Sequence, residues 1–381
     1  MSDKVLAVLL FFLLLISAIP ITSIRAQAVP NPTTFTVATI GNAETCDPAW
    51  AYDTASGELI FNVYEPLLTF DGPAVDAFIP MIAKSWPGSE NPKRNIIPID
   101  PNDPNAPPHP DYTAEIWLFE INTSIRWQNP AYGTVETEDV EYSFERGMVM
   151  DHDGGPAWMI LEPLLMETTL RPDGCNKWNI TIDADAEACG HAIDDVIQSN
   201  ATHVWFNLMQ PYSAFQQILS QSWGCILCKA WCKTDPDNWP GFDVTSYVGW
   251  VDYNDPPVPG PLMNPPAMMG TGPYKLDFWD TDPDVGWYRL VKFNEYWRGW
   301  DGHPHVDTVV IKSVLEWDRR KAMFTSENAA DQVDTCYVPR ALTSQLDGEA
   351  GIRYMKDIPI LSGDAMFFNI AVDPASPHCP K

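Results

Sequence analysis

Three cysteines and two histidines are the residues whose spacing most suggests metal or redox chemistry. Cys225, Cys228 and Cys232 form a Cys-x2-Cys-x3-Cys pattern, which can begin a metal site or supply disulfide partners. A closed structural zinc site needs four ligands, and no fourth ligand lies nearby in the sequence. The segment 303–305 (His-Pro-His) could present two imidazoles, but an exposed loop is the simpler interpretation. We therefore expect no bound metal and no cofactor.

The sequence motifs of common enzymes are absent. The chain has no His-Glu-x-x-His, Gly-x-Ser-x-Gly, phosphate-binding loop or dinucleotide-binding glycine pattern. Its 51 acidic residues make chance pairs of carboxylates unavoidable, so such pairs do not indicate a glycosidase. We predict a protein without catalytic residues.

The N-terminus has the pattern of a secretory signal peptide. Lys4 precedes an apolar run over 5–16, Pro20 interrupts it, and 26–28 (Ala-Gln-Ala) offers a cleavage site. The run is shorter than the roughly 20 residues that a spanning helix needs. We expect residues 1–28 to be a signal peptide and the mature protein to be exported to the cell surface or the periplasm. A retained membrane anchor is the alternative.

Export allows disulfides and glycosylation. Cys175 and Cys189 flank a polar stretch, and a disulfide between them would be worth about 3 kcal/mol. We also expect two of the three cysteines in the Cys-x2-Cys-x3-Cys pattern to form disulfides. Three Asn-x-Ser/Thr sequons are candidate glycosylation sites: Asn122, Asn179 and Asn200.

Length, composition and charge indicate a folded protein that does not bind nucleic acid or anionic membranes. The chain has 381 residues, 45% of them hydrophobic, and a formal net charge of −28. A core is therefore available, but a strongly acidic protein is a poor partner for nucleic acid or anionic membranes. The 36 prolines favour loops and short elements.

The residue pattern predicts strands alternating with helices. Strands are expected near 35–40, 203–208 and 308–314, together in one central sheet. Helices are expected to begin at Ser56 and Thr137, which are good N-cap residues.

Other stretches predict a hairpin, a further helix and loops. The Gly-Thr-Gly-Pro-Tyr segment from Gly270 opens a β-hairpin that closes near Trp297. A helix is expected over 317–324, and the Pro/Asp-rich stretches 91–110 and 236–266 are expected to be loops.

Several short blocks occur along the chain in a fixed order. They are Cys46-Asp47-Pro48, 62–67 (Asn-Val-Tyr-Glu-Pro-Leu), 79–86, 137–144, 270–276 and 294–299. In this order they resemble the blocks of the family 5 extracytoplasmic solute-binding proteins, the peptide- and nickel-binding receptors of ABC importers. The similarity covers roughly residues 33 to 370, and its specificity comes from the order of the blocks.

The resemblance implies a fold. It implies an α/β, periplasmic-binding-protein-like (type II) architecture whose first lobe, over residues 29–350, has a central mixed sheet. A smaller β-rich subdomain is expected between about 75 and 265. Residues 351–381 are expected to begin a second lobe, most of which is missing here.

The resemblance also implies a function. It implies the substrate-binding component of an ABC importer, which delivers an oligopeptide or similar solute to the permease subunits. A metal chelate or an oligosaccharide is also possible as the solute. The alternatives are a secreted hydrolase fragment and a carbohydrate-binding surface module.

Three aromatic residues match cleft positions of the nickel-binding relatives. Tyr52 and Trp158 fall at or near positions where those relatives place aromatic side chains facing the solute. Trp223 lies in the region of a basic cleft residue, and its immediate neighbours include no Arg or Lys. We predict that the three residues bind ligand.

Overall fold

The structure covers most of the chain after the N-terminal segment. The computed structural model describes residues 31–85, 98–257, 268–302, 305–326, 332–348 and 352. The predicted signal peptide, the 303–304 pair and nearly all of the predicted second-lobe segment lie outside these residues. Within the described residues, no helix has both the length and the apolar character to cross a membrane.

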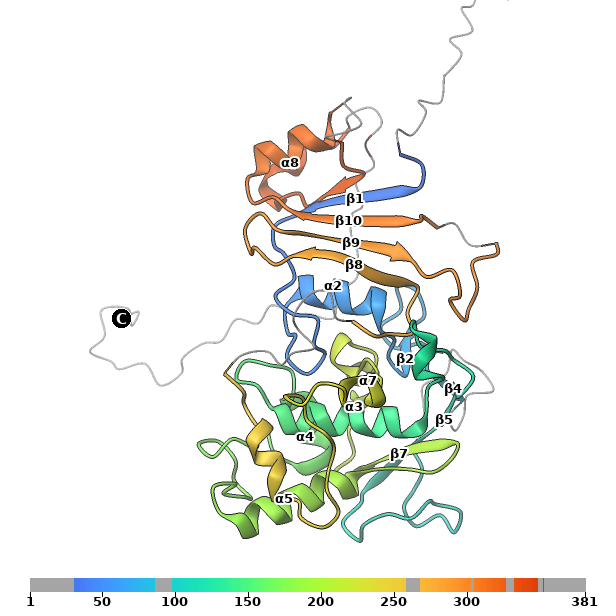
Figure 1. Ribbon diagram of the computed structural model, residues 1–381, viewed down its shortest axis with the longest axis vertical. Coiled ribbons are helices and arrows are strands. Elements are labelled where there is room, and N and C mark those ends of the chain that lie inside the picture. Colours follow the sequence, from blue (N-terminus) through green and yellow to red (C-terminus); the bar gives the residue numbers. More distant parts are fainter. Residues whose placement is uncertain are drawn as a thin grey trace, which may run out of the picture. The chain divides into compact units, whose positions relative to one another are not determined.

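A mixed five-stranded sheet forms one layer of the structure (Figure 1). β1 pairs in parallel with β10 on one side and with β11 on the other, while β10, β9 and β8 follow in antiparallel order. The predicted strands near 35–40 and 308–314 therefore do share a sheet. The strand order is β11 (Thr335–Cys336), β1 (Thr34–Thr39), β10 (Thr308–Ser313), β9 (Trp287–Lys292) and β8 (Tyr274–Asp280).

The predicted hairpin is present as β8 and β9. The two strands pair antiparallel, with Tyr274 opposite Lys292 and Asp280 opposite Trp287. The register shifts between Leu276 and Phe278, which is a β-bulge that increases the local twist.

A second sheet of four strands contains the strand that was expected in the first sheet. β7 pairs antiparallel with β5, with Trp117 opposite Phe206, so the prediction of one sheet for all three strands is wrong. Five of the six residues of β7 are buried, and burial of this kind marks an inner strand without identifying its sheet. The order is β4 (Ala83–Ser85), β5 (Glu115–Ile121), β7 (His203–Leu208) and β6 (Ile197–Ser199), and β2 (Leu68–Phe70) pairs separately with β3 (Phe78–Pro80).

The helices pack on these sheets. α2 contacts β8, whereas α3, α4 and α5 contact the four-stranded sheet (Figure 1). The stretch after β7 forms only a short α6 followed by a 3-10 turn. The α-helices are α2 (Thr54–Val63), α3 (Thr137–Met150), α4 (Trp158–Leu165), α5 (Asp183–Val196), α6 (Phe215–Leu219), α7 (Lys229–Cys232) and α8 (Trp317–Phe324). The 3-10 helices are η1 (Pro130–Tyr132), η2 (Ser222–Gly224), η3 (Val248–Tyr253) and η5 (Arg340–Gln345).

Two helix starts differ from the expected ones by a residue or more. α2 is capped by Asp53, whose side chain accepts a hydrogen bond from the Ser56 amide. α3 is capped by Glu136, which forms a capping box with Asp139. In both cases an acidic side chain satisfies amide groups that the first helical turn leaves unpaired.

A buried glutamate joins the end of α2 to the two ends of the hairpin. Glu65 accepts hydrogen bonds from the Thr271 hydroxyl (2.7 Å), the Tyr296 hydroxyl (2.7 Å) and the Trp297 indole (2.8 Å). Burial raises the pKa of Glu65, and these three hydrogen bonds oppose that rise. Gly270 lies so close to α2 that a Cβ atom there would be 1.8 Å from the Val63 carbonyl oxygen. The block at 62–67, which contains Glu65, and the block at 270–276 therefore contact each other in the folded chain.

A buried carboxyl on α3 should make stability depend on pH. Glu145 is almost fully buried. Burial raises its pKa well above the ordinary value of 4.5, Glu141 and Asp194 raise it further, and Lys229 opposes them. The unfolded chain therefore loses this proton at lower pH than the folded chain does. Consequently, the free energy of unfolding falls as the pH rises from about 4.5 through the folded-state pKa.

We expect Glu145→Gln to reduce this loss of stability, because an amide has nearly the shape of a neutral carboxyl group and does not ionise. Thermal melting of both proteins between about pH 5 and about pH 9 measures the difference. Glu138→Gln, at an exposed position of the same helix, is the matched control and should follow the wild type. A parallel decline in the wild type and Glu145→Gln would contradict the prediction.

Candidate functional site: an aromatic pocket beside a buried ion pair

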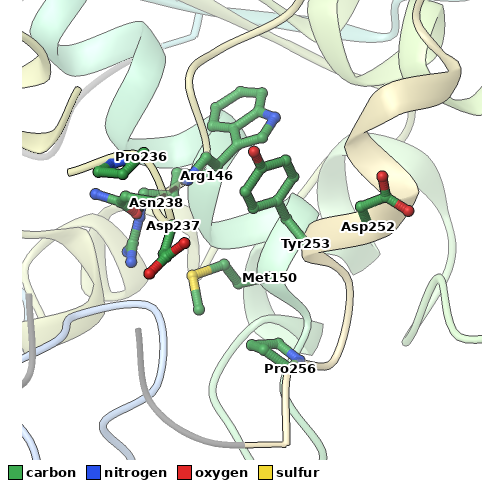
Figure 2. A pocket seen from close by; sticks show the side chains of 9 residues that line it. Arg146, Met150, Pro236, Asp237, Asn238, Asp252, Tyr253 and Pro256 are labelled. Carbon is green, nitrogen blue, oxygen red and sulfur yellow. Dashed lines mark hydrogen bonds between the residues drawn. The ribbon is translucent and has the colours of Figure 1, made fainter. Parts of the chain in front are cut away.

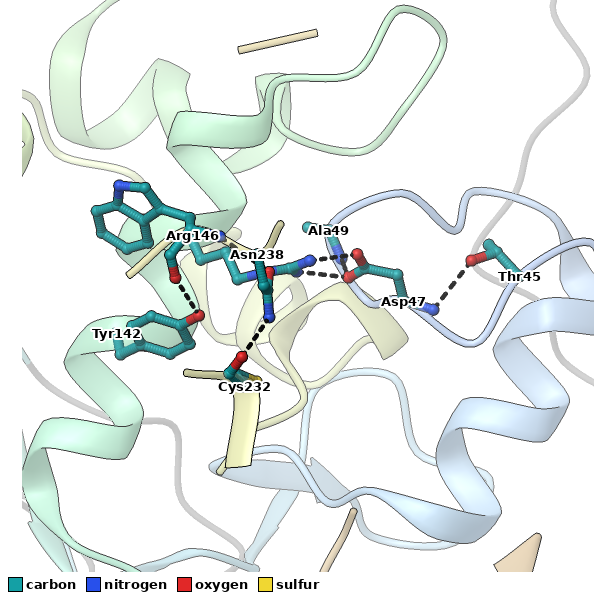
Figure 3. Close-up of polar contacts among 8 residues, drawn as sticks. Thr45, Asp47, Ala49, Tyr142, Arg146, Cys232 and Asn238 are labelled. Carbon is teal, nitrogen blue, oxygen red and sulfur yellow. Dashed lines mark hydrogen bonds and ion pairs between the residues drawn. The ribbon is translucent and has the colours of Figure 1, made fainter. Parts of the chain in front are cut away.

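A fully buried ion pair holds the loop between β1 and α2. Arg146 of α3 donates from its two terminal nitrogens to the two carboxylate oxygens of Asp47, at 2.7 and 2.6 Å (Figure 3). Both side chains are completely buried. The third guanidinium donor, Nε, reaches the Asn238 side chain at 3.0 Å. Two-point pairing of this kind fixes orientation as well as distance.

Asp47 also organises its own loop. Its Oδ1 accepts from the Ala49 amide at 2.8 Å, and its amide donates to the Thr45 hydroxyl at 3.1 Å (Figure 3). Its carbonyl accepts from the amides of Trp50 and Ala51. One residue therefore determines the path of the backbone from Thr45 to Ala51. This is the structural role of the Cys-Asp-Pro block.

The start of α2 fixes the preceding part of the loop. The Ser56 hydroxyl accepts hydrogen bonds from the amides of Glu44 (3.0 Å) and Thr45 (3.1 Å). Ser56 was expected to cap the helix, but its side chain holds this loop instead.

The loop presents two aromatic side chains to a pocket of roughly 340 Å³. We call it the aromatic pocket. It lies between the β1–α2 loop and the turn that follows α3. Its lining residues are Glu44, Thr45, Trp50, Tyr52, Asp53, His152, Asp153 and Gly154.

One wall of the aromatic pocket is a stacked ring pair. The rings of Trp50 and His152 are nearly parallel, with centroids 3.3 Å apart and 13° between their planes. His152 Nδ1 lies 3.3 Å from a carboxylate oxygen of Asp255, and the same oxygen accepts from the Asp153 amide at 3.0 Å. Burial lowers the pKa of His152, against the opposing effect of Asp255.

The backbone around this wall has unusual conformations. Asp151 and Asp255 have φ angles of 29° and 45°, in the left-handed region that residues other than glycine seldom adopt. Such conformations persist only where the surroundings enforce them, and they gather at functional sites.

Of the three aromatic residues predicted to bind ligand, the fold places Tyr52 and Trp223 close together and Trp158 outside the aromatic pocket. Tyr52 lines the aromatic pocket with 47% of its surface exposed, and its ring centroid is 5.7 Å from that of Trp223. Trp223 is half-buried, and its indole nitrogen has no hydrogen-bond partner among the described residues. Trp158 is 38% exposed at the first position of α4 and is not a lining residue. Whether any of the three touches a solute stays a prediction.

Sequence reasoning missed two of the pocket's main residues. Trp50 lies two positions after the Cys46-Asp47-Pro48 block, which was a usable signal. His152 had no signal, because only the contact between the two loops brings it beside Trp50. Neither position belongs to a motif of its own.

A separate cavity of roughly 270 Å³ borders the ion pair but is a weaker candidate site (Figure 2). Arg146, Met150, Asn238 and Tyr253 are among its lining residues. The guanidinium group of Arg146 is already engaged by Asp47 and Asn238. Arg146 therefore serves mainly to hold Asp47 and Asn238 in place.

None of the predicted disulfides is present in the structure, and the pairings stay predictions. All seven described cysteines are free thiols, including Cys175, Cys189, Cys225, Cys228 and Cys232. Cys189 is buried on α5, whereas Cys175 lies partly exposed in the loop before it. Cys225, Cys228 and Cys232 are each buried in the core, and burial raises the pKa of all three thiols. The described residues contain no group of three or more potential metal ligands.

Comparison with known proteins identifies the family. The description "Bacterial extracellular solute-binding proteins, family 5 Middle" matches residues 77–377. The chain belongs to this family. The resemblance found in the sequence blocks is thereby confirmed.

Solved structures share the fold of this family 5 chain. An oligopeptide-binding protein from Borrelia burgdorferi superposes with a TM-score of 0.55 at 15% identity, covering 82% of this chain and 49% of that one. OppA from Burkholderia pseudomallei gives 0.54 at 17% identity, covering 82% and 48%. DppA from Helicobacter pylori in complex with the peptide STSA gives 0.50 at 18% identity, covering 83% and 49%. A comparison with curated proteins finds no match.

These structures confirm the mixed α/β, type II periplasmic-binding-protein-like fold. The chain spans about half the length of the solved relatives it matches. The bounds predicted for the lobes and for the subdomain at about 75–265 stay predictions.

Proposed function

We propose that this protein is the extracytoplasmic substrate-binding component of an ABC importer. It captures a solute and delivers it to the permease subunits, without chemical change. Family membership supports this function, and the observation that carries it is the aromatic pocket held rigid by the Asp47–Arg146 ion pair. A pocket with apolar walls and a few fixed polar groups is what binding of a small solute requires.

An oligopeptide is the solute we favour. The solved structures with the same fold include an oligopeptide-binding protein and a complex with the peptide STSA. The extended backbone of a peptide needs hydrogen-bonding groups, and its side chains need wall surface such as Trp50 and Tyr52 supply. A metal chelate and an oligosaccharide are the alternative solutes.

The location follows from the same proposal. A receptor of this kind works outside the cytoplasmic membrane, so we propose export with removal of residues 1–28. The sequons at Asn122, Asn179 and Asn200 would then be available for glycosylation. Mass spectrometry of the protein from its native source tests both points, through the observed N-terminus and the masses of the three sequon peptides.

Tyr52 and Trp158 are the residues we propose as ligand contacts. Tyr52→Ala and Trp158→Ala in the full-length protein are each expected to weaken solute binding by about 1–3 kcal/mol, the value of a large ring desolvated against ligand. Isothermal titration calorimetry measures the change. Tyr112→Ala removes an exposed ring outside the pocket and is the matched control.

Three outcomes would count against this proposal. Unchanged affinity in both variants, with melting temperatures intact, would show that these rings do not touch the solute. Recovery of a cleaved peptide after incubation would favour a secreted hydrolase instead. Binding to insoluble polysaccharide without soluble solute binding would favour a carbohydrate-binding module.

A further inference from the structure

We propose that the contact between Glu145, Asp194 and Tyr247 is a pH-sensitive clasp, which holds the segment 247–255 against α3 and α5 and opens as the pH rises. This inference goes beyond the proposed function, and only its last step, the effect on solute binding, rests on that function. It is carried by the placement of two carboxyl groups and a tyrosine hydroxyl where three elements meet.

The clasp joins α3, α5 and the start of the segment 247–255. Glu145 of α3 is 6% exposed, and its carboxyl group is hydrogen-bonded to that of Asp194 on α5. Asp194 also accepts a hydrogen bond from the Tyr247 hydroxyl at 2.7 Å. Two carboxyl groups share a hydrogen bond only when one of them keeps a proton. Glu145 keeps it, because it is the more deeply buried of the two.

The first half of the segment is fixed to α5. The Tyr247 amide donates to the Glu187 carboxylate at 2.9 Å, and the Trp250 indole donates to the Ala186 carbonyl oxygen at 3.0 Å. The helix comes so close that a Cβ atom on Gly190 would lie 2.8 Å from the Tyr247 Cβ. Both rings are buried, so this half of the segment follows the position of α5.

The second half of the segment is fixed to the end of α3. The Asn254 side chain donates to the Val149 carbonyl oxygen at 2.9 Å, and the Asp255 amide donates to the Met150 carbonyl oxygen at 2.8 Å. The Asp255 carboxylate in turn contacts His152 in the wall of the aromatic pocket. Separation of α5 from α3 therefore pulls the two halves of the segment apart and disturbs that wall.

The acidic groups around the clasp favour the protonated form. Burial raises the pKa of Glu145, and Glu141, one turn earlier on α3, and Asp194 raise it further. Asp195 adjoins Asp194 on α5. The acidic residue of η3, Asp252, is exposed and lines the separate cavity instead.

The bases around the clasp already have acidic partners. Lys229 of α7 opposes the rise in the pKa of Glu145, but its ammonium group lies 3.1 Å from the Glu138 carboxylate. His191 of α5 stacks on the Tyr247 ring and lies 3.7 Å from the carboxylate of Glu187. Neither base is therefore free to balance a second carboxylate in the clasp.

Loss of the Glu145 proton turns the hydrogen bond to Asp194 into a repulsion. Below the folded-state pKa, Glu145 is neutral and donates to Asp194, so the clasp is closed. Above it, two carboxylates face each other where burial weakens their screening by water. Movement of α5 away from α3 relieves the repulsion, because water then reaches both groups. A local opening of this kind costs less free energy than global unfolding.

Hydrogen–deuterium exchange of the full-length protein tests the clasp without any solute. Protection of the segment 247–255, corrected for the intrinsic pH dependence of exchange, is expected to fall about tenfold or more between about pH 5 and about pH 9, since each pH unit between the open-state and closed-state pKa of Glu145 changes the opening equilibrium tenfold. Glu145→Gln keeps a donor for Asp194 and does not ionise, so its protection should stay nearly constant. Asp183→Asn, at the exposed first position of α5, is the matched control and should behave like the wild type.

Two results of the exchange experiment would overturn the clasp. One is protection of the segment 247–255 that is independent of pH in the wild type, or that falls equally in Glu145→Gln. The other is an equal loss of protection in the hairpin at 274–292, because a global loss of stability would then explain the change.

Calorimetry with trialanine tests the link to the aromatic pocket. At about pH 9 the wild type is expected to bind trialanine about threefold or more weakly than Glu145→Gln does, whereas at about pH 5 the two should bind equally, because only the closed form presents the intact wall. Equal affinities at both pH values, with the exchange result as expected, would overturn the link to solute binding. Absence of trialanine binding in both proteins would count against a peptide as the solute, and the exchange result alone would then decide the clasp.

Discussion

Asp47→Ala is expected to lower the free energy of unfolding by about 3–5 kcal/mol. The substitution leaves the Arg146 guanidinium buried without its carboxylate partner, and a fully buried unpaired charge is among the most destabilising changes a protein can suffer. The loop that carries Trp50 and Tyr52 loses its anchor at the same time. Urea unfolding measures the stability, and calorimetry should show weaker solute binding in the protein that remains folded.

A surface ion pair supplies the matched control. Lys84 and Glu120 are 2.6 Å apart, but the lysine side chain is 61% exposed. Glu120→Ala should therefore cost no more than about 1 kcal/mol. The double variant Asp47→Ala/Arg146→Met should be more stable than Asp47→Ala alone, because no charge is then stranded. If Asp47→Ala and Glu120→Ala were equally mild, the ion pair would not be what holds the loop.

Glu65→Ala is expected to destabilise the protein by about 3–5 kcal/mol, because it leaves three buried or half-buried donors without an acceptor at about 1–3 kcal/mol each, not fully additive. The donors come from both ends of the hairpin, at Thr271 and at Tyr296 and Trp297. The loss therefore separates the hairpin from α2 as well as removing hydrogen bonds. Chemical unfolding followed by tryptophan fluorescence measures it.

Two milder variants test that explanation. Tyr296→Phe removes one of the three donors and should cost about 1–2 kcal/mol. Glu65→Gln keeps one carbonyl acceptor and should fall between Tyr296→Phe and Glu65→Ala. A Glu65→Ala protein as stable as Tyr296→Phe would mean that solvent replaces the lost carboxylate and that the network contributes little.

The sequence predicted strands and helices correctly where the prediction depends only on residues that are close together in the chain. The hairpin at Tyr274–Lys292 and the helix at Trp317–Phe324 lie where Gly/Pro turns, alternation and helical spacing predicted them. These signals depend on steric preferences of neighbouring residues, which act within one turn or one strand. Helix starts were less accurate, since Asp53 and Glu136 compete with Ser56 and Thr137 for the same cap position.

The sequence was weaker wherever distant segments had to be matched. The apolar residues of His203–Leu208 predict a buried strand, but its partner is Glu115–Ile121 and not Thr34–Thr39. Side-chain alternation is the same in both sheets, so the pattern contains no information about which sheet is joined. Cysteine spacing likewise does not show how the thiols are placed, since Cys189 is buried on α5 whereas Cys175 is partly exposed.

The sequence by itself determined the family, because the order of short blocks along the chain needs no coordinates to be read. It also determined the strand and helix types and Tyr52 as a candidate site residue. Only the tertiary structure decided that Tyr52 shares a pocket with Trp50 and His152, and that Asp47 and Arg146 hold that pocket in place. Asp47 and Arg146 are 99 positions apart. Contacts across such a distance arise from packing of whole elements, which no local preference encodes.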